Sequence, residues 1–231
     1  MEKRIFFTNS KGDRLVGILS DEDISKPIVI FAHGLGSSKE SDKYADFQNN
    51  LSKHNISVFK FDFYGHGESE GDFSDVTITE GTDDILCAIK LLKMKGFIKI
   101  GLVGTSFGGI CSIIAASKTA DLMFLGLLVP VSNPEELPDL KHHEDASRLN
   151  YQMNLDSSNN GHKAANKIKI PVYIIHGRND EIVPVKQSIM FAKLLKNAKL
   201  EIIDNADHRM RAPDVYKRIL NQMTDFIVNN F

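Results

Sequence analysis

The 231-residue chain has few cysteines, no long apolar run and no excess of positive charge. Its two cysteines, Cys87 and Cys111, lie in apolar, helix-like segments, so we expect no disulfide framework and a reducing compartment. No run approaches the roughly 18 apolar residues of a membrane span. The first residues also lack the long apolar stretch of a signal peptide. These absences predict a cytoplasmic protein without a membrane span.

The balance of charges argues against a nucleic-acid partner. Lys and Arg total 28 and Asp and Glu total 30, for a formal charge of -2, whereas phosphate binding needs an excess of Lys and Arg. The composition is otherwise ordinary, with 42% hydrophobic and 25% charged residues. A chain of this length can bury a large core and often forms one α/β domain.

Short runs rich in β-branched residues alternate with longer amphipathic segments. The first two runs, 5–8 and 15–19, are separated by a polar turn and predict a hairpin. Repeated strand–helix alternation then predicts parallel pairing with helices on both faces, which is a doubly wound, mostly parallel α/β sheet. Thr79 is expected to cap the first long helix. Further strands are expected at 27–32, 56–61, 99–103, 124–129, 172–176 and 199–203, and helices at 44–54, 79–95, 107–117, 185–196 and 214–229.

One stretch, residues 131–169, interrupts this alternation with prolines, paired histidines and few large apolar side chains. Roughly forty residues is long for an ordinary loop. We therefore expect residues 1–231 to form a single domain in which 131–169 is a small cap or lid. The larger apolar residues of the insertion either line an acyl or aromatic pocket or anchor the insertion to the sheet edge. They are Leu137, Leu140, Leu149, Tyr151, Met153 and Leu155.

A candidate nucleophile stands in the Gly-x-Ser-x-Gly pattern of residues 104–108. The pattern directly follows a predicted strand and directly precedes a predicted helix, as a nucleophile elbow requires. Gly104 and Gly108 would keep side chains out of the tight packing around Ser106. The helix N-terminus supplies unpaired N–H groups, of which that of Phe107 would face a developing oxyanion.

A second glycine-rich loop, residues 33–36, follows an earlier strand. Acyl transfer needs a second N–H donor from such a loop, and Leu35 is its expected source. We expect His33 to hold the shape of the loop rather than to act as a base. A phosphate cradle is a weaker interpretation, because neither G-x-x-x-x-G-K-[ST] nor G-x-G-x-x-G is present.

An acid and a base follow in the order that this type of fold uses, Ser, then Asp or Glu, then His. Asp180 lies in the turn after the strand at 172–176, and His208 lies in the loop after the strand at 199–203. We expect Asp180 to orient His208 and His208 to activate Ser106.

Other acids and histidines are alternatives for the catalytic acid and base, and we consider each of them in turn. Glu181 is the alternative to Asp180, Asp204 and Asp207 are expected to shape their loop, and His176 is expected to be structural. His142 and His143, beside Glu144, are adjacent on a polar segment without a second ligand cluster, so we expect no metal site.

With these motifs, the sequence resembles the α/β-hydrolase superfamily from Pro27 to the last helix. The runs at 33–36, 62–69, 104–108, 176–184 and 207–208 carry the resemblance. It is closest to small bacterial carboxylesterases of the feruloyl or cinnamoyl type, and to monoacylglycerol-lipase-like and serine-aminopeptidase-like members. The resemblance implies Ser106 as nucleophile, His208 as base, Asp180 as its orienting group, an oxyanion hole at Leu35 and Phe107, and His66 as structural.

The expected function is that of a serine carboxylesterase acting on small soluble esters without a metal or organic cofactor. A peptidase or thioesterase of the same fold would use the same acyl transfer, because substrate choice depends on pockets. A binding or regulatory protein without turnover is the alternative from a different class. Edge strands near the termini allow a homodimer, but nothing in the sequence requires one.

Overall fold

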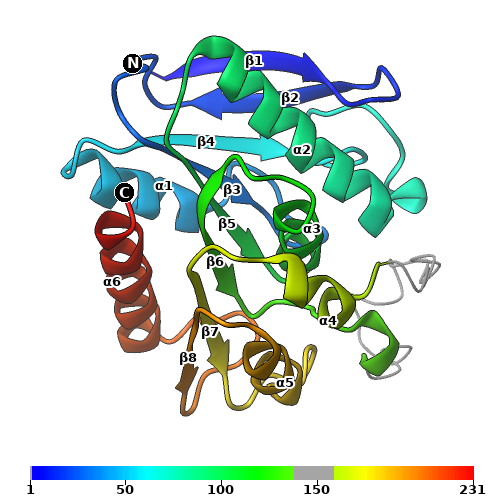
Figure 1. The fold of residues 1–231 in the computed structure, drawn as a ribbon, viewed down its shortest axis with the longest axis vertical. Coiled ribbons are helices and arrows are strands. Elements are labelled where there is room, and N and C mark those ends of the chain that lie inside the picture. Colours follow the sequence, from blue (N-terminus) through cyan, green and yellow to red (C-terminus); the bar gives the residue numbers. More distant parts are fainter. Residues whose placement is uncertain (1, 138–158) are drawn as a thin grey trace.

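A twisted sheet organises the computed structural model of the protein, which describes residues 2–137 and 159–231 (Figure 1). In these residues the strands are β1 Lys3–Thr8, β2 Arg14–Leu19, β3 Ile28–Ala32, β4 Ser57–Asp62, β5 Ile100–Thr105, β6 Leu122–Leu128, β7 Val172–Gly177 and β8 Ala198–Ile203. They lie in the order β1-β2-β4-β3-β5-β6-β7-β8. β2 pairs antiparallel with β1 and β4, and the pairs from β4 to β8 are parallel. The predicted fold class is confirmed, including its antiparallel start.

Helices cover both faces of this sheet (Figure 1). Helices α1, Asp42–Ser52, and α6, Pro213–Asn229, lie together on one face. The other face carries α2 Ile78–Lys95, α3 Phe107–Ala116 and α5 Lys186–Leu194. Shorter turns of helix are η1 Phe73–Asp75, η2 Pro134–Glu136, α4 Gly161–Ala164 and η5 Ala165–Lys167.

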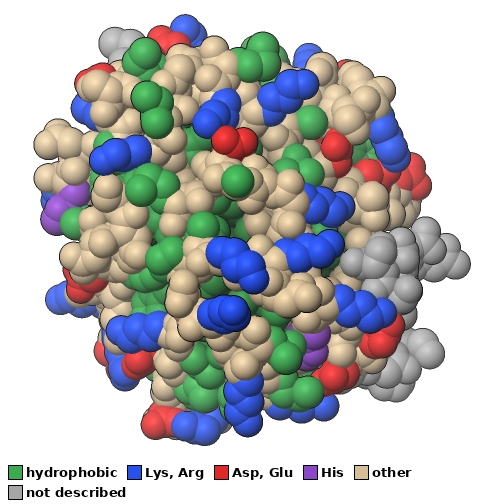
Figure 2. Space-filling model, in the orientation of Figure 1, with side chains coloured by type: hydrophobic (Ala, Val, Ile, Leu, Met, Phe, Trp, Pro, Cys, Tyr) green, Lys and Arg blue, Asp and Glu red, His purple; other side chains and the backbone are tan. Residues whose placement is uncertain are grey.

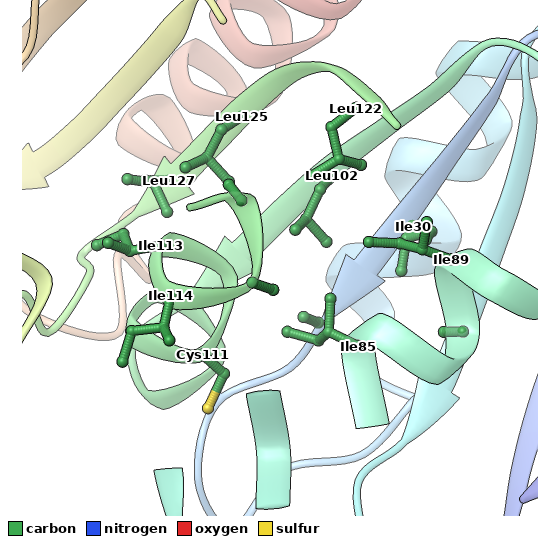
Figure 3. Close-up of a cluster of buried hydrophobic side chains, with 14 of the residues drawn as sticks. Ile30, Ile85, Ile89, Leu102, Cys111, Ile113, Ile114, Leu122, Leu125 and Leu127 are labelled. Carbon is green, nitrogen blue, oxygen red and sulfur yellow. The ribbon is translucent and has the colours of Figure 1, made fainter. Parts of the chain in front are cut away.

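The core is divided by the sheet into two apolar clusters. All five residues of β3 are buried, as its unbroken apolar sequence predicts for a central parallel strand. Figure 3 shows the larger cluster, in which side chains of α2 and α3 pack onto β3, β5 and β6. All ten residues of α3 are buried. Burial of a large aliphatic side chain stabilises the fold by roughly 1.5–3 kcal/mol, so this face anchors the turn that precedes α3.

The first long helix begins two residues before the expected cap. Thr77, not Thr79, is the N-cap of α2, and its Oγ1 accepts a hydrogen bond from the Glu80 N–H at 3.1 Å. Ile78 is fully buried, so the helix has to begin early enough to place this residue against the core. The Thr77-x-x-Glu80 spacing is that of a capping box, which the sequence contained. The prediction that Thr79 caps this helix was therefore wrong.

The two described ends of the 131–169 segment are hydrogen-bonded to each other. The Gly161 N–H donates to the Ser132 carbonyl at 2.8 Å, and Gln187 Oε1 on α5 accepts from the Ser132 and Asn133 N–H groups. These bonds fix the stem of the segment against the sheet. Leu137 packs against the larger core cluster. The other apolar candidates, Leu140, Leu149, Tyr151, Met153 and Leu155, lie outside the described residues, as do His142, His143 and Glu144.

The surface carries charges of both signs (Figure 2), and the two cysteines are not paired in a disulfide. On the face in Figure 2, acidic and basic side chains both occur, with hydrophobic side chains between them. Cys87 is half-buried, Cys111 is buried, and both are free thiols. Within the described ranges, no helix is long and apolar enough to cross a membrane.

A buried carboxyl on α2 makes stability depend on pH. Asp84 is fully buried, and its carboxyl accepts hydrogen bonds from the Tyr64 N–H at 2.8 Å and from Asn9 Nδ2 at 3.4 Å. Burial raises the pKa of Asp84 from 3.8 to about 7 in spite of these bonds. Between these two pH values the folded chain holds a proton that the unfolded chain releases. The free energy of unfolding should therefore fall as pH rises from about 4 to 7.

The matched variant is Asp84→Asn, whose side chain does not titrate. Denaturant unfolding measures the free energy of unfolding of both proteins at about pH 5 and pH 7. Between these pH values it should fall by about 1–3 kcal/mol more in the wild type than in the variant. Equal slopes of stability against pH in the two proteins would contradict this assignment.

Candidate active site

Ser106 occupies the turn between β5 and α3 in a strained backbone conformation. Its φ of 52° and ψ of -113° lie in a region that costs a residue with a side chain about 1–3 kcal/mol. The surrounding backbone holds this conformation. The Ser106 N–H donates to the Leu128 carbonyl at 3.0 Å, and the Ser106 carbonyl accepts from Gly109 at 2.9 Å and Val131 at 3.2 Å. The predicted elbow is therefore present.

Two glycines allow the elbow to pack closely. A Cβ at Gly104 would lie 2.4 Å from the Gly108 carbonyl oxygen. A Cβ at Gly108 would lie 2.3 Å from the Ala32 carbonyl oxygen at the end of β3. Both contacts are with backbone atoms, which cannot move aside as a flexible side chain would. The two glycines are therefore a steric requirement for packing α3 closely against β5 and against the end of β3.

Three loops bring Ser106, His208 and Asp180 into contact. His208 follows β8 and Asp180 follows β7, so both lie at the carboxyl edge of the sheet beside the elbow. His208 Nε2 is 3.0 Å from Ser106 Oγ, and His208 Nδ1 is 2.7 Å from Asp180 Oδ2. With its proton on Nδ1, the ring donates to Asp180 and accepts from the serine hydroxyl. This is the geometry of a nucleophile, a base and an orienting acid.

The Asp180 carboxylate is held by donors on both oxygens. Its Oδ1 accepts from the Ile182 and Val183 N–H groups at 3.0 and 2.8 Å, and His176 Nε2 lies 3.1 Å from Oδ2. Burial alone would raise the pKa of this carboxyl. The hydrogen bonds from His176 and His208 and the backbone outweigh burial and lower the pKa of Asp180 to about 2.

His176, which we expected to be structural, contacts the Asp180 carboxylate. It is fully buried at the end of β7, with Nδ1 2.7 Å from Ser188 Oγ and Nε2 2.8 Å from the Val183 carbonyl oxygen. These contacts fix the ring that touches Asp180. In the sequence, the contact between His176 and Asp180 is indicated only by the position of His176 at the end of a strand, four residues before Asp180.

The competing acids lie elsewhere, as expected. Glu181 is exposed, and Asp204 forms an ion pair with Arg178 on the surface. Asp207 Oδ1 accepts from the Met210 N–H at 2.6 Å and thereby shapes the loop that carries His208.

The predicted oxyanion loop lies beside the serine. The ideal Cβ position at Gly34 is 3.5 Å from Ser106 Cβ, so the loop backbone runs directly over the nucleophile candidate. Neither the Leu35 N–H nor the Phe107 N–H has a hydrogen-bond partner among the described residues, and both residues line the cavity at Ser106. Two backbone donors are thus available next to the serine.

Two histidines maintain the shape of this loop. His33 donates from Nδ1 to the Gly34 carbonyl at 2.8 Å and accepts from the Phe63 N–H at 3.2 Å. His66 accepts from the Gly36 N–H at 3.2 Å and donates to the Tyr64 carbonyl at 3.0 Å. Both contact backbone rather than Ser106, in agreement with the structural roles that we expected for them.

A cavity of about 770 Å³ opens onto Ser106 and His208. This volume is within the usual range for small-molecule sites. Its described apolar lining comes from several elements, namely Leu35, Phe73, Ile110, Val131, Leu137, Ile182 and Val183. In residues 2–137 and 159–231, no group of three or more His, Cys, Asp or Glu side chains is placed to hold a metal ion.

With this fold and site, the chain belongs to the α/β-hydrolase fold family. A family model described as serine aminopeptidase, S33, matches residues 23–138, and one described as alpha/beta hydrolase fold matches residues 134–210. The predicted resemblance is confirmed at the level of the family.

Individual relatives are distant but cover most of the chain. A palmitoyl-protein thioesterase, ABHD10 of Bos taurus, is 24% identical over 87% of this chain and 73% of its own length. A monoglyceride lipase homolog of Monkeypox virus is 23% identical over 88% of this chain and 90% of its own. The structure of Est1E from Butyrivibrio proteoclasticus with ferulic acid bound superimposes with a TM-score of 0.80, at 24% identity over 98% of both chains.

The close approach of α3 to β3 gives a matched pair of substitutions. Gly108→Ala should lower the free energy of unfolding by about 1–3 kcal/mol, because its Cβ would overlap the Ala32 carbonyl oxygen. Gly34→Ala adds the same methyl group with only ordinary contacts, so its stability should stay within about 1 kcal/mol of the wild type. Chemical denaturation measures both values. Equal stability of the two variants would contradict the steric account of the elbow.

Proposed function

We propose that this protein is a serine carboxylesterase that hydrolyses small soluble carboxylic esters through Ser106, His208 and Asp180. The observation that carries the proposal is the continuous chain of contacts from Ser106 Oγ to His208 at 3.0 Å and from His208 to Asp180 at 2.7 Å. Residue types that suit a nucleophile, a base and an orienting acid are thus in contact, and the first two line one cavity.

In the proposed acylation step, Ser106 Oγ attacks the ester carbonyl carbon while its proton passes to His208 Nε2. The carbonyl oxygen becomes an oxyanion and accepts hydrogen bonds from the Leu35 and Phe107 N–H groups. Such preorganised donors are worth about 3–4 kcal/mol each in comparable enzymes. The bond from carbon to the alcohol oxygen then breaks, and the imidazolium of His208 returns its proton to the departing alcohol.

Deacylation repeats the same chemistry with water. Neutral His208 removes a proton from a water molecule as its oxygen attacks the acyl carbon. The bond to Ser106 Oγ then breaks, the serine recovers its proton from His208, and the carboxylic acid leaves. Asp180 stays ionised throughout and stabilises the positive ring each time it forms. Apart from the substrate and this water, the proposed cycle uses only groups of the chain itself.

The size of the cavity and its position support a small substrate. Apolar side chains of Phe73, Ile110 and Leu137 provide contacts for an acyl or aromatic group near the serine. We propose that residues 1–231 act as one domain in which 131–169 covers this cavity. Leu137 supports this placement, because it lies in the segment and also lines the cavity.

Thioester hydrolysis is the second candidate, and the name of one relative favours it. The bovine relative is described as a palmitoyl-protein thioesterase, and the viral relative as a monoglyceride lipase homolog. A thioester carbonyl would be attacked by the same serine. A panel of matched oxygen esters and thioesters with acyl chains from acetyl to palmitoyl, together with feruloyl esters and aminoacyl anilides, separates these activities and the peptidase alternative.

Substitution of the proposed nucleophile tests the mechanism directly. Ser106→Ala should lower kcat on a 4-nitrophenyl ester by several orders of magnitude, of the order of 10⁶ as in a comparable triad. The circular dichroism spectrum of the variant should match that of the wild type, because the substitution removes only one oxygen atom. A fluorophosphonate probe should label the wild type but not the variant.

Ser112→Ala is a suitable control because Ser112 is buried in α3 and does not line the cavity. This variant should retain probe labelling. Near-wild-type turnover by Ser106→Ala would exclude the proposed mechanism, and a wild type that neither reacts with the probe nor turns over esters would favour a binding protein.

The pH profile tests the assignment of the base. The low pKa of Asp180, about 2, keeps this carboxylate ionised over the whole working range, so it should produce no step above about pH 4. A histidine base has to be neutral to accept a proton, and kcat/KM should therefore rise from the acid to the neutral range. Initial rates measured from about pH 5 to 8, with spontaneous hydrolysis subtracted, show the step. A flat profile would argue against a histidine base.

A further inference from the structure

The cavity at Ser106 contains a group of cations that the proposed chemistry does not use. Lys43, Arg209 and Arg211 line it, whereas no Asp or Glu of the described residues does so. The whole chain carries a formal charge of -2, so this is a local concentration of positive charge. Acyl transfer requires the serine, its base and the two amide donors, and it leaves these three side chains without a role in the reaction.

The cations come from one side of the cavity. Lys43 is in the first turn of α1, and Arg209 and Arg211 follow His208 in the connection between β8 and α6. Lys43 Nζ donates to the Arg209 carbonyl at 3.0 Å, which joins the two segments. Helices α1 and α6 share one face of the sheet (Figure 1).

The apolar lining comes mainly from the opposite face. Ile110 is on α3, Phe73 is in η1 and Leu137 follows η2, and all three belong to the larger core cluster or pack against it. The cavity therefore has a cationic side and an apolar side, with Ser106 and His208 among its lining residues.

In the part of the chain that the structure describes, Lys43 has no counter-ion in spite of its partial burial. Burial lowers the pKa of Lys43, Asp207 raises it in part, and Arg211 and Arg209 lower it further. Asp207 acts on Lys43 from a distance, and its Oδ1 accepts a hydrogen bond from the Met210 N–H. Among the described residues, neither Lys43 nor Arg211 has a carboxylate within ion-pair distance. A partly desolvated cation is stabilised when an anion is placed beside it.

We propose that the preferred substrate is an ester that carries an anionic group, a carboxylate or a phosphate, which binds at Lys43 and Arg211 while the ester carbonyl lies at Ser106. This inference rests on the proposed esterase function. The guanidinium of Arg211 can bind either anion through two parallel hydrogen bonds, and the Lys43 ammonium adds a point charge. An apolar segment of the same substrate would contact Phe73 and Leu137.

Matched pairs of esters test the proposal. On the acyl side, mono-4-nitrophenyl adipate is compared with 4-nitrophenyl hexanoate. On the alcohol side, 4-acetoxybenzoate and 4-acetoxyphenyl phosphate are compared with 4-acetoxybenzamide, which distinguishes a carboxylate from a phosphate. Each kcat/KM is divided by the rate constant of spontaneous hydrolysis to correct for reactivity. The wild type should prefer at least one anionic ester by about tenfold or more.

The double variant Lys43→Met/Arg211→Gln should lose this preference by about tenfold, with the loss confined to the anionic ester. Raising ionic strength from about 0.05 to 0.5 M should also reduce the preference of the wild type, because salt screens the attraction. Lys53→Met is the matched control, since Lys53 caps the other end of α1 and does not line the cavity. It should retain the wild-type preference.

Two outcomes would overturn the inference while leaving the esterase function intact. They are equal corrected rates for the anionic and neutral esters, and an unchanged preference in the double variant. If the wild type hydrolyses none of the esters, the proposed function fails, and calorimetry decides the inference separately. Binding of 4-hydroxybenzoate or inorganic phosphate that is tighter than that of 4-hydroxybenzamide, and is lost in the double variant, would support it. Binding without such a difference would overturn it.

Discussion

The approach of α3 to the end of β3 is the constraint on which the site depends. Ser106 can stand between β5 and α3 with a φ of 52° only because its neighbours leave room for the backbones to meet. A Cβ at Gly108 would lie 2.3 Å from the Ala32 carbonyl oxygen, and one at Gly104 would lie 2.4 Å from the Gly108 carbonyl oxygen. The fully buried α3 supplies the apolar contacts that offset the strain of the turn. Phe107 directly follows the serine, and Leu35 follows Gly34 in the loop after β3, so both proposed oxyanion donors lie in the segments that meet here.

Two buried aspartates show how hydrogen bonding controls charge in this protein. Burial raises the pKa of Asp84 to about 7, since its two donors do not compensate for lost water. Burial acts in the same direction on Asp180, but donors from His176, His208 and the backbone outweigh it and lower the pKa to about 2. The difference comes from the number and type of donors. It leaves the carboxylate beside His208 ionised, which the proposed mechanism requires.

The distribution of charge adds to what the total charge indicates. A formal charge of -2 argued against a nucleic-acid partner, and that argument concerns the whole surface. Within the cavity the described lining is cationic, because Lys43 and two arginines from separate segments converge there. A total over the chain cannot show such a local group. The proposed preference for anionic esters follows from this convergence rather than from composition.

The sequence by itself determined the fold class, because alternation of apolar strands with amphipathic helices allows few ways of burying both faces of a sheet. It also determined the order of Ser106, Asp180 and His208, since each follows a predicted strand and parallel strands place such loops at one edge. The cap of α2 was misplaced by two residues although its signal is local, because the Thr77-x-x-Glu80 capping box stands in the sequence. The sequence did not show that His176 contacts Asp180 or that Lys43 meets the loop after His208. These two features depend on side-chain direction and on contacts between distant segments. Only the tertiary structure decides them, because the order of strands and loops predicts which loops share a sheet edge but not which side chains within them come into contact.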